Sequence, residues 1–233
     1  MQMMSIGGNC ANLSILGEMR VPGPVDNWST QHGFADVPCL FEDFKDVVSA
    51  GPVEILPHPK GFPTDCDKRY RYKHYQAVHL YMDNPEVVSK VFARHDKFLA
   101  FIERVKTEPD CYFIYTLNEN DVERRNGKWM PKDHFLPTAR KLEVYFPLNK
   151  LIFIGTVKDK CGGGCFCAHT EEFPEELNYI DLTDIRHFKS EMTEVYLRKI
   201  ASKLASFAST PPHPKHEFFV RRPQKVIQDD WED

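Results

Sequence analysis

The sequence predicts an α/β protein, a single domain with a central, mostly parallel sheet flanked by helices. Two apolar runs of strand length, 111–117 and 150–157, have the unbroken hydrophobic character of strands that are covered on both faces. Segments with helical periodicity stand before and between these runs, and the clearest of them covers 85–106. Strands that alternate with helices predict a parallel sheet, because a parallel crossover needs a connection of about helix length.

The first half of the chain opens with a short apolar segment that ends in two glycines, and a helix is expected from Cys10 onward. Apolar residues at spacings of three and four predict a second helix over 33–48. The segment 53–71 is rich in proline, glycine and charge, which favours a loop or short irregular strands. Over 70–81 aromatic residues alternate with basic residues and histidine, and this pattern favours a strand.

The second half begins with the helix over 85–106, which has proline at its first turn and one apolar stripe. After the first apolar strand, a polar connection over 118–132 leads to a helix around 133–144. After the second apolar strand, a short strand at 179–182 and a final helix over 188–208 complete the expected order.

The bulk composition predicts an ordinary globular domain. The 233 residues suit a domain over 1–209, followed by a proline-rich, acid-ended tail over 210–233 that we expect to be extended. A formal net charge of −4 offers no basic field for nucleic acid, so no nucleic-acid partner is expected. No apolar run reaches membrane-spanning length and no secretory signal is recognisable, which predicts a cytoplasmic protein without a membrane partner. The seven cysteines are expected to be mostly reduced thiols.

The strongest chemical signal is the cysteine that follows the two opening glycines. Cys10 is expected near the first turn of its helix, where unpaired N–H groups and the helix dipole favour a thiolate and can hold an oxyanion. The two glycines leave backbone space for a substrate to approach, and Gly7, Gly8 and Asn9 are the expected substrate contacts. The alternative is a tight turn in which Cys10 is only a small buried hydrophobe.

A nucleophilic cysteine needs a base and a group that orients the base. His79, at the end of the strand predicted over 70–81, is the first choice for the base, with His74 as the reserve and as a substrate contact. Asp26 is the candidate orienting carboxylate, and Trp28 beside it is a candidate wall of the site. The alternative for this pair is an Asx turn and a tryptophan that covers the edge of the core. His95, on the apolar stripe of the long helix, is expected to be a hydrogen-bonded core residue.

Several of these motifs together resemble a bacterial family of papain-like cysteine peptidases. The family opens with Ser-Leu-Gly-x-Asn-Cys and continues to a Pro-Phe-Asp-Trp element, and this chain has matching segments at 5–10 and 24–28. Later family features match 78–80, 94–102 and 112–115. The resemblance implies a thiol-dependent site with Cys10 as nucleophile, His79 as base, and Asp26 and Trp28 as site residues. The chain departs from the pattern at Gly8, Asn27 and Leu80.

A second cluster of ligand-type residues follows the second apolar strand. Its thiols and imidazole suit tetrahedral zinc by type, although the spacing would wrap one short loop around the ion. The alternatives are a flexible glycine loop and a redox-labile thiol cluster. The members of this cluster are Cys161, Cys165, Cys167 and His169.

The leading hypothesis is therefore a cysteine-nucleophile hydrolase without a cofactor, either a papain-like peptidase or a related acyl hydrolase or transferase. Its partner would be a small-molecule or peptide substrate. The competing hypotheses are a non-catalytic binding or scaffold module of the same fold, and a zinc-stabilised protein that uses the loop at 161–169.

Overall fold

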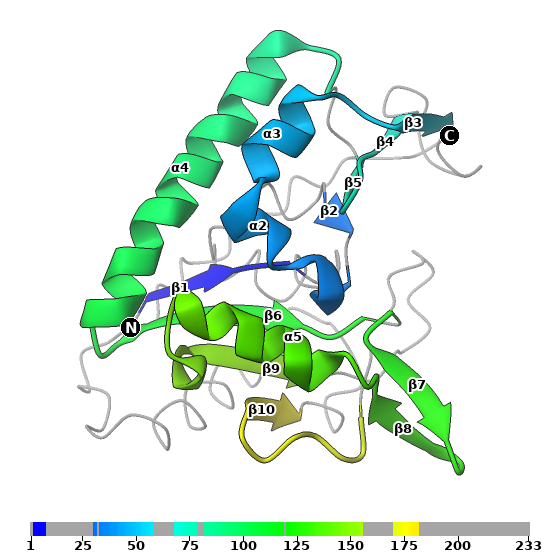
Figure 1. Ribbon diagram of the computed structural model, residues 1–233, viewed down its shortest axis with the longest axis vertical. Helices are drawn as coiled ribbons and strands as arrows, with labels where there is room; N and C mark the ends of the chain where they lie inside the picture. The colour runs from blue at the N-terminus through cyan, green and yellow to red at the C-terminus, as the bar shows by residue number, and fades with distance from the viewer. Residues whose placement is uncertain are drawn as a thin grey trace, which may run out of the picture.

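The computed structural model describes residues 2–7, 30–31, 33–57, 68–78, 82–118, 120–155 and 170–181. Its centre is a four-stranded sheet in the order β1-β6-β9-β10, in which every adjacent pair is parallel (Figure 1). The strands are β1 (Gln2–Ser5), β6 (Cys111–Thr116), β9 (Leu151–Gly155) and β10 (Asn178–Asp181). The predicted α/β class with a central parallel sheet is confirmed for this part of the chain.

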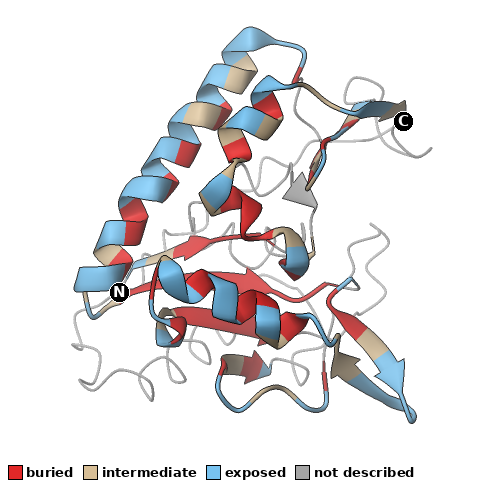
Figure 2. Cartoon of the chain, in the orientation of Figure 1, coloured by how far each residue is buried: buried red, intermediate tan, exposed pale blue. Residues whose placement is uncertain are grey.

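Burial explains why the two apolar runs were recognisable as strands. Every residue of β6 and of β9 is buried, and both strands lie at the centre of the sheet (Figure 2). A strand covered on both faces loses the alternation of polar and apolar residues, and that is the pattern the sequence shows.

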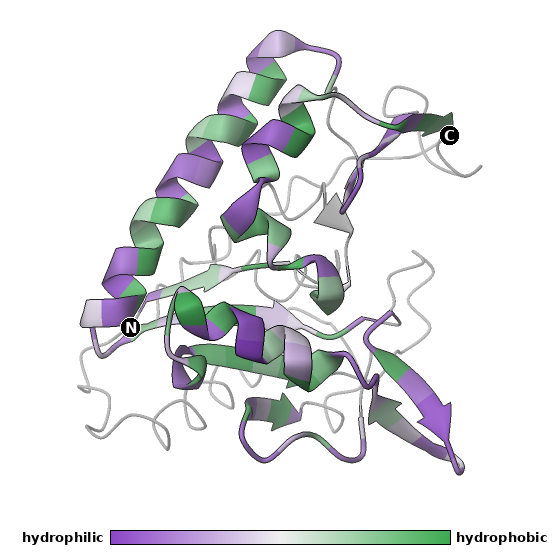
Figure 3. Ribbon diagram, in the orientation of Figure 1, coloured by the Kyte–Doolittle hydropathy of each residue, from purple (hydrophilic) through white to green (hydrophobic). Residues whose placement is uncertain are grey.

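The longest helix is α4 (Pro85–Thr107), and its prediction is confirmed. Asn84 caps its start, because the side-chain oxygen accepts a hydrogen bond of 2.9 Å from the backbone N–H of Glu86. Apolar and polar residues alternate along the helix so that one stripe faces the core (Figure 3). The buried residues of this stripe are Val91, His95, Phe98, Phe101, Ile102 and Val105.

The single helix predicted over 33–48 is wrong, although its apolar stripe is largely buried as expected. The segment forms a 3-10 turn η1 (Phe34–Asp36) and two short helices, α2 (Cys39–Glu42) and α3 (Phe44–Ser49). Pro38 has no N–H to continue a helix across it, and Asp43 leaves the helical region at φ −132°.

A second, antiparallel sheet was not predicted. Its order is β2-β5-β4-β3, with β2 (Thr30–Gln31), β3 (Glu54–Pro57), β4 (Lys68–Arg71) and β5 (Gln76–Val78). The strand predicted over 70–81 is instead a hairpin, closed by a hydrogen bond of 2.8 Å from the N–H of Tyr72 to the carbonyl of Tyr75. The two tyrosine rings stack across this turn at 4.7 Å. The turn residues Lys73 and His74 include no glycine or asparagine, so the usual hairpin signal is missing from the sequence.

The polar connection predicted over 118–132 contains another hairpin, β7 (Val122–Arg125) and β8 (Lys128–Pro131). Asn126 and Gly127 form its turn with φ values of 52° and 83°. An Asn-Gly pair suits such a turn because both positions need positive φ. The helix predicted around 133–144 is present as α5 (Phe135–Lys141), continued by the 3-10 turn η2 (Leu142–Val144). A further 3-10 turn, η3 (Leu148–Lys150), leads into β9.

An aromatic cluster fixes η1 against the central sheet. The ring of Phe34 lies 5.0 Å from Tyr115 of β6, 4.9 Å from Phe153 of β9 and 4.5 Å from Phe135 of α5. All four side chains are fully buried. Four elements that are distant in sequence therefore share one core, and η1 is held close to the end of β6.

The helices of the described part include none that is both long and apolar enough to cross a membrane. The helix expected from Cys10, the final helix over 188–208 and the tail over 210–233 lie outside the described residues. The division into a domain and a tail therefore stays a prediction.

Candidate active site

The strands of the central sheet end together at one edge. Ser5 of β1 pairs with Ile114 of β6, and Thr116 at the end of β6 pairs with Ile154 of β9. The residues that leave β1 and β6 therefore start from the same edge, the carboxyl edge. Open α/β sheets commonly bind ligands there, because the loops that follow parallel strands gather at that edge.

Gly7 is the first candidate site residue that the structure describes. Its φ of 114° is a conformation that residues with a side chain rarely adopt, so this position, two residues after the end of β1, favours glycine. Its backbone N–H donates to the hydroxyl oxygen of Ser5 at 3.3 Å, and Ser5 is fully buried. The path of the chain after Gly7 lies outside the described residues, so the sharp turn expected there stays a prediction.

Most of the predicted site residues lie outside the described part of the chain. The proposed nucleophile Cys10 follows Gly7 by three positions in the sequence, and the proposed base His79 directly follows Val78, the last residue of β5. The other predicted residues outside the described part are Gly8, Asn9, Asp26 and Trp28, together with Cys161, Cys165, Cys167 and His169 of the glycine and cysteine loop.

The described candidate His74 lies in the turn between β4 and β5 and is about three-quarters buried. Its Nδ1 is 3.7 Å from Oδ1 of Asp36, and its Nε2 is 4.0 Å from Oδ2 of Asp43. These separations exceed hydrogen-bond distance, so the two carboxylates act on the imidazole through charge and not through direct hydrogen bonds. Because both ring nitrogens face carboxylates, this arrangement suits an oriented wall residue better than a base that must keep one nitrogen for a thiol.

A small pocket of about 280 Å³ opens beside His74. It lies between the β4–β5 turn, the start of η1 and the loop that follows β6, and we call it the His74 pocket. Its lining residues are Gly33, Ala35, Asp36, Arg71, Tyr72, His74, Tyr75, Gln76, Asn120 and His134. Most of these residues have polar side chains, and Asn120 belongs to the loop at the carboxyl edge of the sheet.

A buried carboxylate, missed by the sequence analysis, holds this edge together. Asp121 is fully buried, and its Oδ1 accepts a hydrogen bond of 2.7 Å from the N–H of Phe34. Its Oδ2 accepts from the N–H of Asn118 at 2.8 Å and from the hydroxyl of Tyr115 at 2.9 Å. The carboxylate therefore joins the start of η1 to the end of β6. Gly33, directly before η1, lies close to the loop that follows β6. A Cβ added at Gly33 would approach the Cβ of Asn120 to 3.4 Å, so the start of η1 packs closely on that loop.

Burial controls the electrostatics of this network. It raises the pKa of Asp121 from 3.8 to about 6, and the three hydrogen bonds act in the opposite direction. The pKa of Tyr115 is raised well above its usual value, first by burial and then by the charge of Asp121. The tyrosine therefore stays a hydrogen-bond donor. The sequence signal for Asp121 was its place among polar residues that directly follow a buried strand.

Cys39, the cysteine described near the His74 pocket, has the features of an unreactive thiol. Cys39 is buried, and burial followed by the charges of Asp36, Asp43 and Glu42 raises its thiol pKa to about 12. A thiol with that pKa carries almost no thiolate at neutral pH.

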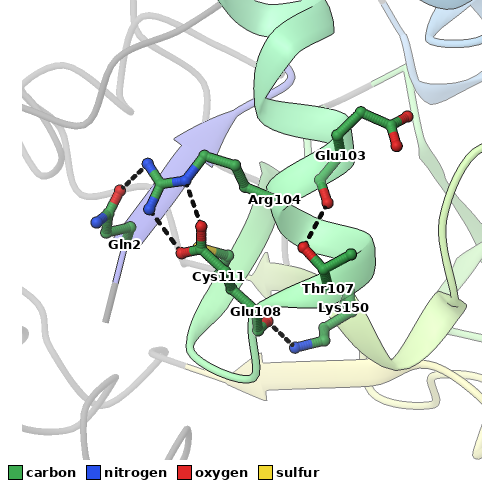
Figure 4. A network of polar contacts seen from close by, with 7 residues as sticks. All are labelled: Gln2, Glu103, Arg104, Thr107, Glu108, Cys111 and Lys150. Atoms are coloured by element: carbon green, nitrogen blue, oxygen red, sulfur yellow. Dashed lines mark hydrogen bonds and ion pairs between the residues drawn. The ribbon is translucent and has the colours of Figure 1, made fainter.

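The opposite, amino edge of the sheet carries a polar network of a different kind (Figure 4). Both carboxylate oxygens of Glu108 accept from the guanidinium of Arg104, at 2.7 and 2.6 Å, and Arg104 also donates to the side chain of Gln2 at 2.5 Å. The thiol of Cys111 donates to Glu108 at 3.1 Å, and Lys150 donates to its backbone carbonyl at 2.8 Å. This network clamps the start of β1 to the end of α4.

Ligand-type atoms of Glu108, Asp110 and Cys111 lie within 4.8 Å of one another. The hydrogen bonds from Arg104 and Cys111 lower the pKa of Glu108 to about 2, whereas burial, followed by the hydrogen bond to Glu108, raises the pKa of Cys111 to about 12. The carboxylate is already paired with Arg104 and the thiol keeps its proton, so these contacts fit a structural clamp rather than a metal centre.

His95 confirms its expected role in the core. It is buried, its Nε2 lies 2.6 Å from the carbonyl oxygen of Leu40, and its ring stacks on Phe44 at 4.4 Å. Burial lowers its pKa, so the imidazole is neutral and donates from Nε2 to that carbonyl.

Comparisons of the chain with protein-family models, with curated proteins and with solved structures found no match.

Proposed function

We propose that the protein is a thiol-dependent acyl hydrolase with peptidase-like chemistry, in which Cys10 is the nucleophile, His79 its base and Asp26 the group that orients the base. The thiolate attacks the acyl carbon, and the leaving group departs with the proton that the imidazole has taken from the thiol. Water, activated by the same imidazole, then hydrolyses the thioester and restores the thiol.

The observation that supports this proposal most is the position of Gly7. β1 belongs to the parallel sheet, and Gly7, with its positive φ of 114°, follows it at the carboxyl edge, where α/β proteins commonly place their sites. Cys10 follows Gly7 by three positions in the sequence. A glycine-framed segment between a strand and a nucleophile is typical of sites that expose a reactive side chain at the top of a sheet.

The hairpin of β4 and β5 supports the choice of base. This hairpin supplies Arg71, Tyr72, His74, Tyr75 and Gln76 to the lining of the His74 pocket, and His79 follows β5 directly. The pocket lies at the turn that starts β5, and the base we propose follows the other end of this three-residue strand in the sequence. We also infer a cytoplasmic location, which suits a reduced nucleophile.

The test is the rate of alkylation of each cysteine by iodoacetamide between pH 5 and 9, read site by site by mass spectrometry on folded protein. Cys10 should react with a midpoint well below the ordinary thiol value of about 8.5. Cys39 and Cys111 are controls within the same molecule, because both are buried with pKa values raised to about 12, and they should stay unlabelled until the protein unfolds. If Cys10 is alkylated only on unfolding, together with Cys39 and Cys111, then it is a packing residue and not a nucleophile.

Activity is then measured on p-nitrophenyl esters and on a peptide library. Cys10→Ala should abolish turnover while the thermal unfolding midpoint stays close to that of the wild type, and His79→Gln should lower turnover and move the Cys10 alkylation midpoint upward. Full turnover by Cys10→Ala would refute the proposed nucleophile.

A further inference from the structure

The His74 pocket has room for one small group. Its volume of about 280 Å³ is just below the range of roughly 300–1,000 Å³ that is usual for small-molecule sites. The pocket can therefore hold one side chain or one small metabolite. Its lining combines polar and apolar surface, and its polar side chains include a carboxylate, a guanidinium, amides and imidazoles.

The charged and titratable side chains that line this pocket are one carboxylate, one guanidinium and the imidazoles of His74 and His134. The guanidinium, that of Arg71, is paired at 3.0 Å with Glu54, which does not line the pocket. The pocket's carboxylate, Asp36, keeps 41% of its side chain exposed, and its closest basic group among the described residues is the imidazole of His74 at 3.7 Å. Asp43 adds a second carboxylate on the far side of that imidazole.

The pKa values of two neighbouring groups, Cys39 and Tyr115, show the effect of these carboxylates. After burial, the causes that raise the pKa of Cys39 are three carboxylates, Asp36 first, and no cation opposes them. The charge of Asp36 also helps to raise the pKa of Tyr115 on the other side of η1. The surroundings of Asp36 thus favour a positive charge over a negative one.

We propose that the His74 pocket binds a primary ammonium group, such as the side chain of a lysine residue, through the carboxylate of Asp36. Asn120 and Gln76 supply neutral polar contacts around it, and His74, turned toward Asp36 and Asp43, forms the wall. The inference rests on the proposed function only in making this ammonium group part of the substrate. An acyl compound with an amine on a short aliphatic chain would then be the substrate class that the enzyme selects.

The test is isothermal titration calorimetry at pH 8 and low salt, where an ordinary imidazole is neutral and a lysine side chain is charged. The probes are Nα-acetyl-lysinamide and its uncharged analogue Nα-acetyl-norleucinamide. We expect the lysine amide to bind at least tenfold more tightly than the norleucine amide. Asp36→Asn should lose at least tenfold in affinity for the lysine amide, whereas Asp46→Asn, an exposed carboxylate of α3 outside the pocket, should bind as the wild type does.

A second variant and a salt dependence allow the test to be read even if Asp36→Asn unfolds. Asp36→Ser serves as a second variant if the asparagine variant unfolds, and 0.5 M salt should weaken binding of the lysine amide to the wild type. Equal affinity for the two amides, no binding of either, or unchanged binding by both Asp36 variants would overturn the inference.

The alkylation of Cys10 in the wild type separates this inference from the proposed function. If the wild type binds the lysine amide more tightly than the norleucine amide while Cys10 shows no reactive thiolate, the ammonium pocket stands and the hydrolase does not. If Cys10 is reactive and the wild type binds the two amides equally, the hydrolase stands and the ammonium pocket does not.

Discussion

At the scale of single residues, Asp121 determines how the carboxyl edge is held. Its partners are all donors, two backbone N–H groups and the hydroxyl of Tyr115, so the site needs a group that only accepts hydrogen bonds. Asp121→Asn keeps the shape but places an amide N–H₂ against one or two of these donors. We expect a loss of about 1–3 kcal/mol in the free energy of unfolding. Urea unfolding measures the loss, with Asp46→Asn as the exposed control, and equal stability of the two variants would contradict it.

The same carboxylate gives stability a pH dependence. Its pKa is about 6 in the folded chain against 3.8 as the ordinary value, so the folded state binds the proton more tightly between these pH values. Stability from this group is therefore greatest at low pH and falls as pH rises through 6. Between pH 5 and 7.5 the wild type should lose about 1 kcal/mol relative to Asp121→Asn. Parallel pH profiles for the two proteins would show that Asp121 does not titrate in this window.

At the scale of elements, α4 is anchored by one face only. Phe98 is fully buried and its ring lies 4.9 Å from Phe41 and 5.6 Å from Phe113, whereas the next residue, Leu99, is 36% exposed. Phe98→Ala should lower the free energy of unfolding by about 3–5 kcal/mol, because it leaves a cavity between α4 and the sheet. The neighbouring Leu99→Ala should cost less than about 1 kcal/mol. Chemical denaturation of both variants checks the contrast.

Elements were predictable where a local pattern decides the structure. β6, β9 and α4 follow from apolar runs and from one helical stripe, and these patterns need no knowledge of distant contacts. The turn at Lys73 and His74 was missed because its stability comes from stacking between Tyr72 and Tyr75 and not from turn residues. Likewise, Asp121 was not identified because its buried partners include Phe34, which is distant in sequence. Of the predicted site, the structure describes Gly7 and His74.

At the scale of the whole molecule, the two edges of the sheet respond to acid in opposite ways. The pKa of Glu108 is held at about 2, below its ordinary value of 4.5, by Arg104 and Cys111. This pairing stabilises the fold above pH 4.5 and is lost as pH falls toward 2. Glu108→Gln should therefore flatten the acid limb of the stability profile and leave the slope around pH 6 intact. Circular dichroism melts between pH 2 and 8 test this, and an unchanged acid limb would show that the clamp does not contribute.

The large sequence separation between the paired strands β1 and β6 affects folding during translation. Gln2 pairs with Cys111, so β1 must wait for a partner that the ribosome adds much later. At roughly 5–20 residues per second, that delay lasts about 5–20 s. During it β1 has no β6 to pair with, and a nascent chain stalled before 111–116 should therefore lack the carboxyl edge altogether. If the proposed function holds, the thiol would become reactive only once this late strand has been translated.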